Sequence, residues 1–205
     1  MSFYEENVVP YIVDCCCGIK ALHPVRQKLV AQASGTLLEI GFGSGLNLPY
    51  LPAAVERVLA VDPSERGRRI GQERLEQARC PVDFIGLDAQ VVQAESASAD
   101  TALTTFTLCT IPEAAAALRE VKRILKPGGK LLFLEHGRAP DPSVVRWQER
   151  LNPLQRALFG GCNLDRDVAA MVREAGFTLT TLDSGYFPRV PRTHGYLYSG
   201  VAISI

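Results

Sequence analysis

Three glycines, Gly41, Gly43 and Gly45, stand at every second position directly after the apolar run at 36–40. Glycine lets the backbone turn through positive φ and come close to a ligand. A short apolar run bounded by glycine is typical of a buried parallel strand, and a strand followed by such a turn binds nucleotides in open α/β sheets. The pattern predicts a nucleotide-type cofactor site. A tight turn that binds nothing is the alternative.

The spacing of the glycines disfavours a dinucleotide. The dinucleotide pattern G-x-G-x-x-G would require its third glycine at position 46, which is Leu46. The chain instead has G-x-G-x-G, with Glu39 two residues before the first glycine. An NAD(P)-dependent dehydrogenase is therefore only an outside alternative.

Two acids follow the next two predicted strands. Asp62 ends the strand at 57–61, where a carboxylate can accept hydrogen bonds from two ribose hydroxyls. Asp88 follows the strand at 82–85, where it would face an adenine amine. The alternatives are a turn-forming role for Asp62 and a helix N-cap for Asp88.

The overall charge balance argues against a strongly electrostatic nucleic-acid binder. Lys and Arg together number 22, as do Asp and Glu, so the net charge of zero argues against nucleic acid. We find no run of about 18 apolar residues and no basic stretch typical of a secretion signal. We therefore expect a small-molecule substrate, no stable membrane insertion and a cytoplasmic location, and the oligomeric state stays open.

The cysteines do not form a recognisable metal motif. Three of the six are adjacent, Cys15, Cys16 and Cys17, and no C-x-x-C pair occurs. Successive helix residues point about 100° apart, so these three cannot reach one metal. We expect reduced, half-buried helix residues and no metal site.

Apolar runs and helical patterns alternate along most of the chain. The expected strands cover 36–40, 57–61, 82–85, 100–108, 130–135, 178–183 and 196–205, and the expected helices cover 64–79, 113–125, 143–159 and 165–175. This alternation predicts the α/β class, with a Rossmann-like doubly wound sheet of seven strands. The sheet should be mostly parallel with one antiparallel C-terminal strand, because the last connection is too short for a crossover helix.

Four features together resemble class I S-adenosylmethionine-dependent methyltransferases: the glycine turn, Asp62, Asp88 and a helix followed by "LKPGG". The segment "RILKPGG" at 123–129 is similar to the R-x-L-K-P-G-G of the ubiquinone-biosynthesis type. This resemblance covers residues from about 34 to 137 and implies S-adenosyl-L-methionine as the cofactor. The candidate cofactor-binding residues are Glu39, Gly41, Gly43, Gly45, Asn47, Asp62, Pro63, Asp88, Ala89 and Thr107.

Further segments extend the resemblance to almost the whole chain. They are "TLCTIPE" at 107–113, "LEHG" at 134–137, "WQERLNPL" at 147–154 and "GGCNLDRD" at 160–167. They resemble the methyltransferase-like group that includes the mammalian alkyl thiol methyltransferases and bacterial relatives. Two departures stand out. The mammalian members carry a hydrophobic N-terminal anchor that has no counterpart here, and the third-strand motif G-x-A-E reads G-L-D-A-Q.

The acceptor side should lie at the carboxyl ends of strands four and five. That places His136 and Cys109 there as the candidate catalytic residues. His136 is either a base or a brace for its loop, and Cys109 is either reactive or a small apolar wall. Arg166 either pairs with an acidic substrate or with Asp165 or Asp167.

The sequence thus predicts a single methyltransferase domain over 1–205. Residues 1–34 would form a helical lid, and 35–205 a core with substrate-side insertions at about 138–165 and 184–195. The expected acceptor is a small, fairly apolar molecule, and the resemblance favours a thiol. The alternatives are N- or O-methylation of a lipid head group or quinol-like ring, and a cofactor-binding module without turnover.

Overall fold

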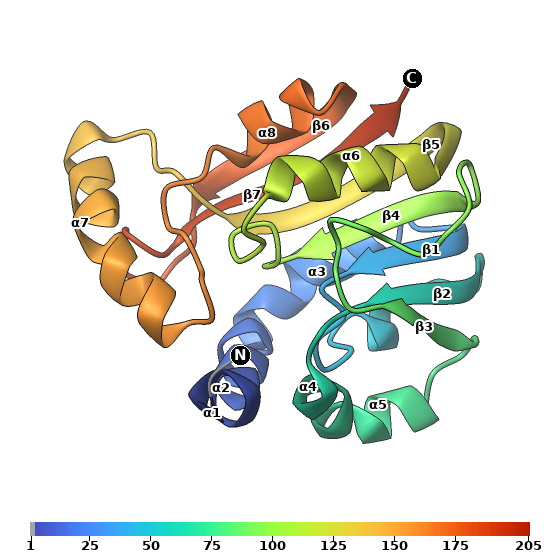
Figure 1. Ribbon diagram of the computed structural model, residues 1–205. Coiled ribbons are helices and arrows are strands. Elements are labelled where there is room, and N and C mark those ends of the chain that lie inside the picture. Colours follow the sequence, from blue (N-terminus) through green and yellow to red (C-terminus); the bar gives the residue numbers. More distant parts are fainter. Residues whose placement is uncertain (1–2) are drawn as a thin grey trace.

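The computed structural model describes residues 3–205 and is built on a seven-stranded sheet (Figure 1). The strands run in the spatial order β3-β2-β1-β4-β5-β7-β6. Their bounds are β1 Gly35–Ile40, β2 Val55–Val61, β3 Val82–Gly86, β4 Ala99–Thr105, β5 Leu125–His136, β6 Phe177–Tyr186 and β7 Tyr196–Ser204. The order reverses beside β1, and ligands of open α/β sheets bind at such a switch point.

The strand pairing confirms the predicted sheet. β1 pairs in parallel with β2 and β4, and β4 pairs in parallel with β5. β7 is antiparallel to both of its neighbours, β5 and β6. The fold is therefore the Rossmann-like, mostly parallel doubly wound sheet with one antiparallel C-terminal strand.

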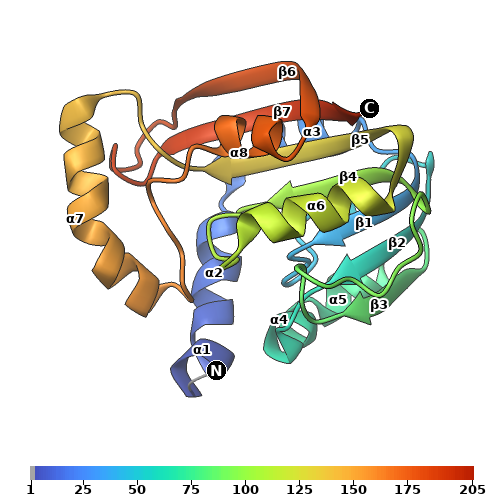
Figure 2. The ribbon, with the colours of Figure 1, turned by 45° about the horizontal axis from the view of Figure 1, so that its top comes forward.

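Helices cover both faces of this sheet (Figure 2). Their bounds are α1 Phe3–Asn7, α2 Val9–Cys17, α3 His23–Val30, α4 Glu65–Ile70, α5 Gln72–Glu76, α6 Ala114–Ile124, α7 Pro142–Leu158 and α8 Val168–Glu174. α6 and α8 bury apolar residues in one core cluster, and α3 buries Leu29 and Val30 in a second cluster on the other face. The carboxyl ends of β1 and β4 point to the side where α1, α2 and α7 lie (Figure 1).

Several predicted element bounds differ from the structure; for example, β5 begins at Leu125 rather than at 130. Two of the differences have a clear local cause. β4 ends at Thr105 rather than at 108, because Phe106 takes a φ of +53° and turns the chain out of the sheet. The helix expected over 64–79 divides into α4 and α5 at Gly71. A Cβ at Gly71 would lie 2.2 Å from the carbonyl oxygen of Ser44, so glycine there allows the loop after β1 to pack closely.

Among residues 3–205, no helix combines the length and the apolar character that crossing a membrane requires.

Candidate active site

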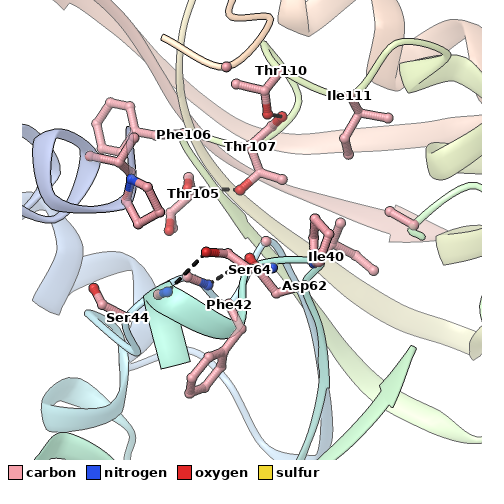
Figure 3. A pocket seen from close by; sticks show the side chains of 18 of the residues that line it. Ile40, Phe42, Ser44, Asp62, Ser64, Thr105, Phe106, Thr107, Thr110 and Ile111 are labelled. Atoms are coloured by element: carbon pink, nitrogen blue, oxygen red, sulfur yellow. Dashed lines mark hydrogen bonds between the residues drawn. The ribbon is translucent and has the colours of Figure 1, made fainter. Parts of the chain in front are cut away.

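A cavity of about 360 Å³ opens at the carboxyl ends of β1, β2 and β4 (Figure 3). Its size falls in the usual range for small-molecule sites. Of the ten predicted cofactor residues, eight line the cavity: Gly41, Gly43, Asn47, Asp62, Pro63, Asp88, Ala89 and Thr107. Glu39 and Gly45 do not line it, and neither do His136 and Cys109.

The glycine turn after β1 forms the floor of the cavity. Gly41 has a φ of +74°, and a Cβ there would lie 2.0 Å from the hydroxyl oxygen of Thr107. Gly43 has a φ of +56°, and a Cβ there would find no atom closer than 4.0 Å. Gly45 serves the turn itself, since a side chain there would press on Phe42 and Leu48. The first two glycines therefore let backbone form the wall that a ligand meets.

Asp62 follows β2 and holds this turn in place. One carboxylate oxygen accepts from the backbone N–H of Gly43 at 2.8 Å, and the other accepts from that of Ser64 at 2.7 Å. Burial raises the pKa of Asp62, although these two hydrogen bonds oppose the shift. A carboxylate oxygen has about two acceptor sites, so each oxygen keeps one for a ligand hydroxyl.

Glu39 acts on the cavity through Asn47. The Asn47 amide donates to Glu39 Oε1 at 2.6 Å and to the Thr105 hydroxyl at 3.1 Å. Desolvation by burial raises the pKa of Glu39 to about 7. The buried Arg26 of α3 donates to the side-chain oxygen of Asn47 at 2.5 Å and to the backbone carbonyl of Cys17 at 2.9 Å. Sequence reasoning missed Arg26, because a lone arginine in a short helix has no feature that separates it from a surface residue.

Helix α2 is fastened to the glycine turn by polar contacts. Asp14 accepts from the Ser44 hydroxyl at 2.5 Å and from Arg74 of α5 at 2.8 Å. Arg74 also donates to the Ser44 carbonyl at 3.0 Å. These contacts fix α2 over the cavity, where Val9, Val13 and other α2 side chains line it.

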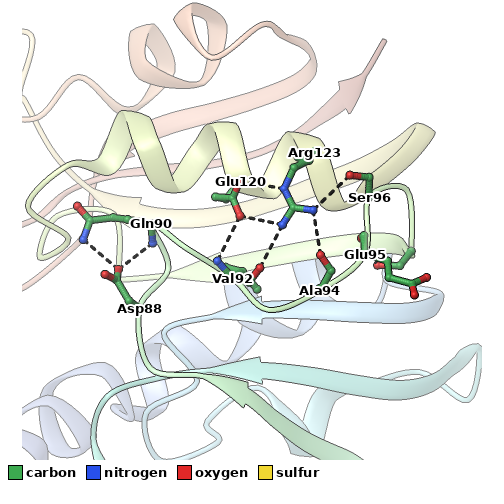
Figure 4. Close-up of polar contacts among 9 residues, drawn as sticks. Asp88, Gln90, Val92, Ala94, Glu95, Ser96, Glu120 and Arg123 are labelled. Carbon is green, nitrogen blue, oxygen red and sulfur yellow. Dashed lines mark hydrogen bonds and ion pairs between the residues drawn. The ribbon is translucent and has the colours of Figure 1, made fainter.

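The loop that carries Asp88 is held by the R-x-L-K-P-G-G arginine (Figure 4). Arg123 donates to the carbonyls of Ala94 and Val92 at 2.9 and 3.1 Å, and Glu120 accepts from the Val92 N–H at 3.2 Å. Asp88 itself is exposed and accepts from the backbone and side chain of Gln90. Its carboxylate therefore turns toward its own loop, while Ala89 is buried at the cavity wall.

Glu135 shapes the opposite wall of the cavity. This fully buried carboxylate at the end of β5 accepts from the backbone N–H groups of Thr107 and Leu108, at 2.9 and 3.2 Å. Burial raises the pKa of Glu135 to about 7 against the effect of these hydrogen bonds. The resemblance covered "LEHG", but sequence reasoning gave its glutamate no role.

His136 and Cys109 meet Cys162 in a cluster behind this wall. His136 Nε2 lies 3.1 Å from Cys162 Sγ, and Cys109 hydrogen-bonds to the same sulfur. The hydrogen bond from Cys109, and then that from His136, lowers the pKa of Cys162 against the effect of burial. Burial alone would lower the pKa of His136, but its contact with Cys162 outweighs this and raises it.

Arg166 contacts backbone carbonyls and, among residues 3–205, forms no ion pair with Asp165 or Asp167. Its guanidinium donates to the carbonyls of Leu108, Ile111 and Pro112. The predicted pairing with a neighbouring aspartate is therefore wrong, and the pairing with an acidic substrate stays a prediction. Arg166 instead braces the turn between β4 and α6, because those three carbonyls lie outside any strand or helix and need donors.

The insertion at 184–195 packs against α7 instead of lining the cavity. Arg192 contacts Asp141 at 2.9 Å, and Gln148 of α7 donates to the Thr193 carbonyl at 3.1 Å. The insertion at 138–165 does reach the cavity, through Phe159 and Gly160.

Much of the cavity lining is apolar. α2 contributes Val9 and Val13, the turn after β4 contributes Phe106 and Ile111, and Phe159 follows α7. Such a wall accepts an apolar ligand and offers little to a charged one.

Comparison with known proteins shows the family to which the chain belongs. The family described as "Methyltransferase domain" matches residues 38–133. Human thiol S-methyltransferase TMT1A is 30% identical over 172 residues, which cover 80% of this chain and 70% of that protein. The chain belongs to the class I S-adenosylmethionine-dependent methyltransferases.

Other relatives agree with this assignment. Rat thiol S-methyltransferase TMT1B is 30% identical over 72% of this chain, which spans 62% of the rat protein. The C-methyltransferase UbiE of Rubrivivax gelatinosus is 35% identical over 51% of this chain and 40% of its own length. A solved methyltransferase of Thermotoga maritima superposes with a TM-score of 0.68 at 20% identity, covering 98% of both chains, and shares the fold. The cofactor of this enzyme is therefore S-adenosyl-L-methionine.

The residues at the cavity fit that cofactor. Asp62 offers free acceptor sites for the ribose hydroxyls, and Gly43 leaves space where a side chain would stand. Glu39 Oε2 is buried with no partner among residues 3–205, and Asn47 connects this acid to the cavity.

Proposed function

We propose that this methyltransferase transfers the methyl group to the sulfur of a small, fairly apolar thiol. The observation that carries the proposal is the apolar part of the cavity lining, which includes Val13, Phe106 and Phe159. These side chains offer contacts for a hydrocarbon chain in the same cavity as the cofactor-binding residues.

The extent of the similarity favours a thiol over a ring acceptor. The match to UbiE covers about half of the chain. The match to human TMT1A covers 80% of the chain and so takes in more of the residues outside the shared methyltransferase domain. Methylation of a quinol-like ring is the second candidate, and the UbiE match is what favours it.

Methyl transfer to a thiol requires few specialised groups from the protein. The sulfonium of S-adenosylmethionine supplies an electrophilic methyl group when bound. A thiol has a pKa of about 8.5, so a modest shift gives thiolate at neutral pH. The chain must then hold the sulfur in line and exclude water, which the apolar wall and α2 would do.

We assign His136 and Cys109 to the acceptor side of this site. Cys109 lies in the turn after β4, which ends at the cavity, and His136 ends the neighbouring β5. Phe106 lines the cavity and stacks on the His136 ring with a centroid distance of 6.4 Å. His136 Nδ1 is buried without a partner among the described residues, which leaves one polar atom for a ligand.

We also propose that α1 and α2 act as the lid predicted over 1–34. The remainder of that segment, α3, packs against the sheet, so the lid would end at Cys17. All six cysteines are free thiols, which suits work in the reducing cytoplasm.

The test compares matched acceptors with purified protein. Hexanethiol, hexanol, an ethanolamine lipid and a quinol would each be supplied with S-adenosylmethionine, and the initial rate of S-adenosylhomocysteine formation measured. The proposal expects turnover with hexanethiol and none with hexanol, which has the same chain but an acceptor far harder to deprotonate. Turnover with the quinol alone would replace the proposal with the second candidate.

A further inference from the structure

We propose that Cys109, His136 and Cys162 bind a zinc-type divalent ion, and that the acceptor thiol occupies its fourth coordination position. The second part rests on the proposed thiol methylation. The first part stands on the geometry of the three side chains alone.

The three residues come together from distant segments. Cys109 lies in the turn after β4, His136 ends β5, and Cys162 precedes α8. One ligand atom from each residue lies within 4.8 Å of the other two. His136 Nε2 and Cys162 Sγ are 3.1 Å apart. A tetrahedral zinc with bonds of about 2.0 to 2.3 Å separates its ligands by roughly 3.5 to 3.8 Å. Small side-chain movements would therefore produce the required geometry.

The donor set selects the class of metal. Two thiolates and one imidazole are soft and borderline ligands, which suit zinc and exclude magnesium or calcium. Three protein ligands instead of four leave one position open, which is typical of catalytic zinc sites and not of structural ones. Gln155 Nε2 lies 3.5 Å from Cys162 Sγ and would hydrogen-bond the coordinating sulfur.

The charge of the metal and that of its two protein thiolates balance, since zinc with two thiolates carries no net charge. Glu135 and Arg166 both interact electrostatically with the cluster. Both cysteines are buried and His136 is partly exposed, so the cluster is neither sealed nor on the surface.

The cluster lies next to the cofactor cavity. Phe106 separates them, since it lines the cavity and stacks on His136. Cys17 of α2 also lines the cavity, and the charge of Cys162 is near enough to act on it. A thiol bound at the open position would thus approach from the side of the cavity.

The chemistry of this step balances without a redox partner. On coordination the acceptor thiol releases its proton to solvent and becomes a thiolate. Its sulfur then forms the new bond to the methyl carbon, and the bond from that carbon to the sulfonium breaks. The electron pair of the broken bond stays on the cofactor sulfur, which gives S-adenosylhomocysteine.

The test uses Co²⁺ as a spectroscopic probe on the full chain. Chelator-treated, fully reduced protein would be titrated with Co²⁺, and the thiolate-to-cobalt charge-transfer band and the visible bands of tetrahedral cobalt recorded. The proposal expects one equivalent to bind with two thiolates. Hexanethiol without S-adenosylmethionine should then increase the charge-transfer band by about half, as a third thiolate joins.

Variants assign the bands to the cluster. Cys162→Ser and Cys109→Ser should each lose tetrahedral cobalt binding, whereas Cys80→Ser, outside the cluster, should bind like the unmodified protein. Circular dichroism of each variant checks that the fold persists. If a variant unfolds, the titration of the unmodified protein still decides the question.

Each outcome separates the metal site from the proposed function. Methylation of hexanethiol by chelator-treated protein that binds no Co²⁺ overturns the metal site and leaves the function standing. Cobalt binding with an unchanged band on adding hexanethiol overturns the role of the fourth position. Cobalt binding by a protein that methylates no thiol supports the site and removes the proposed function.

Discussion

Asp62 is the residue that we propose to connect the fold to the cofactor. Its two oxygens accept from the backbone N–H groups of Gly43 and Ser64, and its side chain lines the cavity. In this proposal the turn and the ribose depend on one carboxylate.

Removal of that carboxylate should abolish cofactor binding. We expect Asp62→Ala to raise the Kd for S-adenosylhomocysteine at least about 100-fold, since two hydrogen bonds to a charged group are lost. Isothermal titration calorimetry measures this. Asp83→Ala is the matched control, because Asp83 is an exposed acid on the edge strand β3 that pairs with Arg57 and does not line the cavity. An unchanged Kd in Asp62→Ala would contradict the ribose assignment.

Glu39 should make the stability of the protein depend on pH. Burial raises its folded pKa from 4.5 to about 7, so the folded state binds the proton more tightly than the unfolded state. This contribution is fully present below about pH 4.5 and is lost as the pH rises through 7. Relative to Glu39→Gln, the free energy of unfolding of the unmodified protein should fall by about 3 kcal/mol between pH 4.5 and 7.5.

Urea unfolding of both proteins across this pH range measures the difference. Glu56→Gln, an exposed glutamate on β2, is the control and should track the unmodified protein. Parallel curves for the unmodified protein and Glu39→Gln would show that the buried carboxyl does not titrate as described.

The individual residues differ in how far the sequence could predict them. Gly41, Gly43 and Asp62 were predictable, because a strand followed by glycine and a strand followed by an acid are local patterns. Arg26 was not, since its partners Asn47 and Cys17 reach it only through tertiary packing. His136 and Cys109 were placed together from the order of the strands, but the approach of Cys162 was missed for the same reason, because it comes from a distant segment.

At the scale of elements, α1 and α2 are the part of the chain that could open and close the site. α2 lines the cavity and is fastened by Asp14 to Ser44 and Arg74. Helices this short contribute few buried apolar residues, so their loss should affect the ligand more than the core.

Deletion of residues 1–16 tests the lid. We expect the Kd for S-adenosylmethionine to rise about tenfold, while the melting temperature of the ligand-free protein changes by only a few degrees. Differential scanning calorimetry and calorimetric titration give the two quantities. Equal affinity in the shortened chain would remove the lid proposal.

Arg123 of α6 holds the loop that follows Asp88 through hydrogen bonds to its backbone carbonyls. Replacing it with Met keeps most of the apolar stem but leaves the carbonyls of Val92 and Ala94 without their donor, so we expect a loss of about 1 to 3 kcal/mol of stability. The loop should also exchange its amide hydrogens faster. Arg119→Met, on the exposed face of the same helix, is the control. Hydrogen exchange that is no faster in 88–98 than in the control would refute this role.

The elements themselves were largely predictable. The alternation of strand and helix patterns predicted the seven strands. The short connection before β7 predicted that this strand is antiparallel. The end of β4 was not predictable, because nothing in the residue type of Phe106 signals its positive φ. The division of α4 from α5 at Gly71 depends on the approach of Ser44, which only the packed structure provides.

At the scale of the whole molecule, one cavity brings together two sets of residues. The carboxyl ends of β1, β2 and β4 carry the proposed cofactor-binding residues. We propose that side chains from α2, the turn after β4 and the segment after α7 form the acceptor side and select the molecule that receives the methyl group.

Transfer of a labelled methyl group to a thiol tests the central claim most directly. The protein would be incubated with hexanethiol and S-adenosylmethionine that carries a trideuterated methyl group, and the products analysed by mass spectrometry. The account predicts the trideuteromethyl thioether of hexanethiol, formed in proportion to S-adenosylhomocysteine and absent with Asp62→Ala. Cofactor binding without any thioether would contradict it.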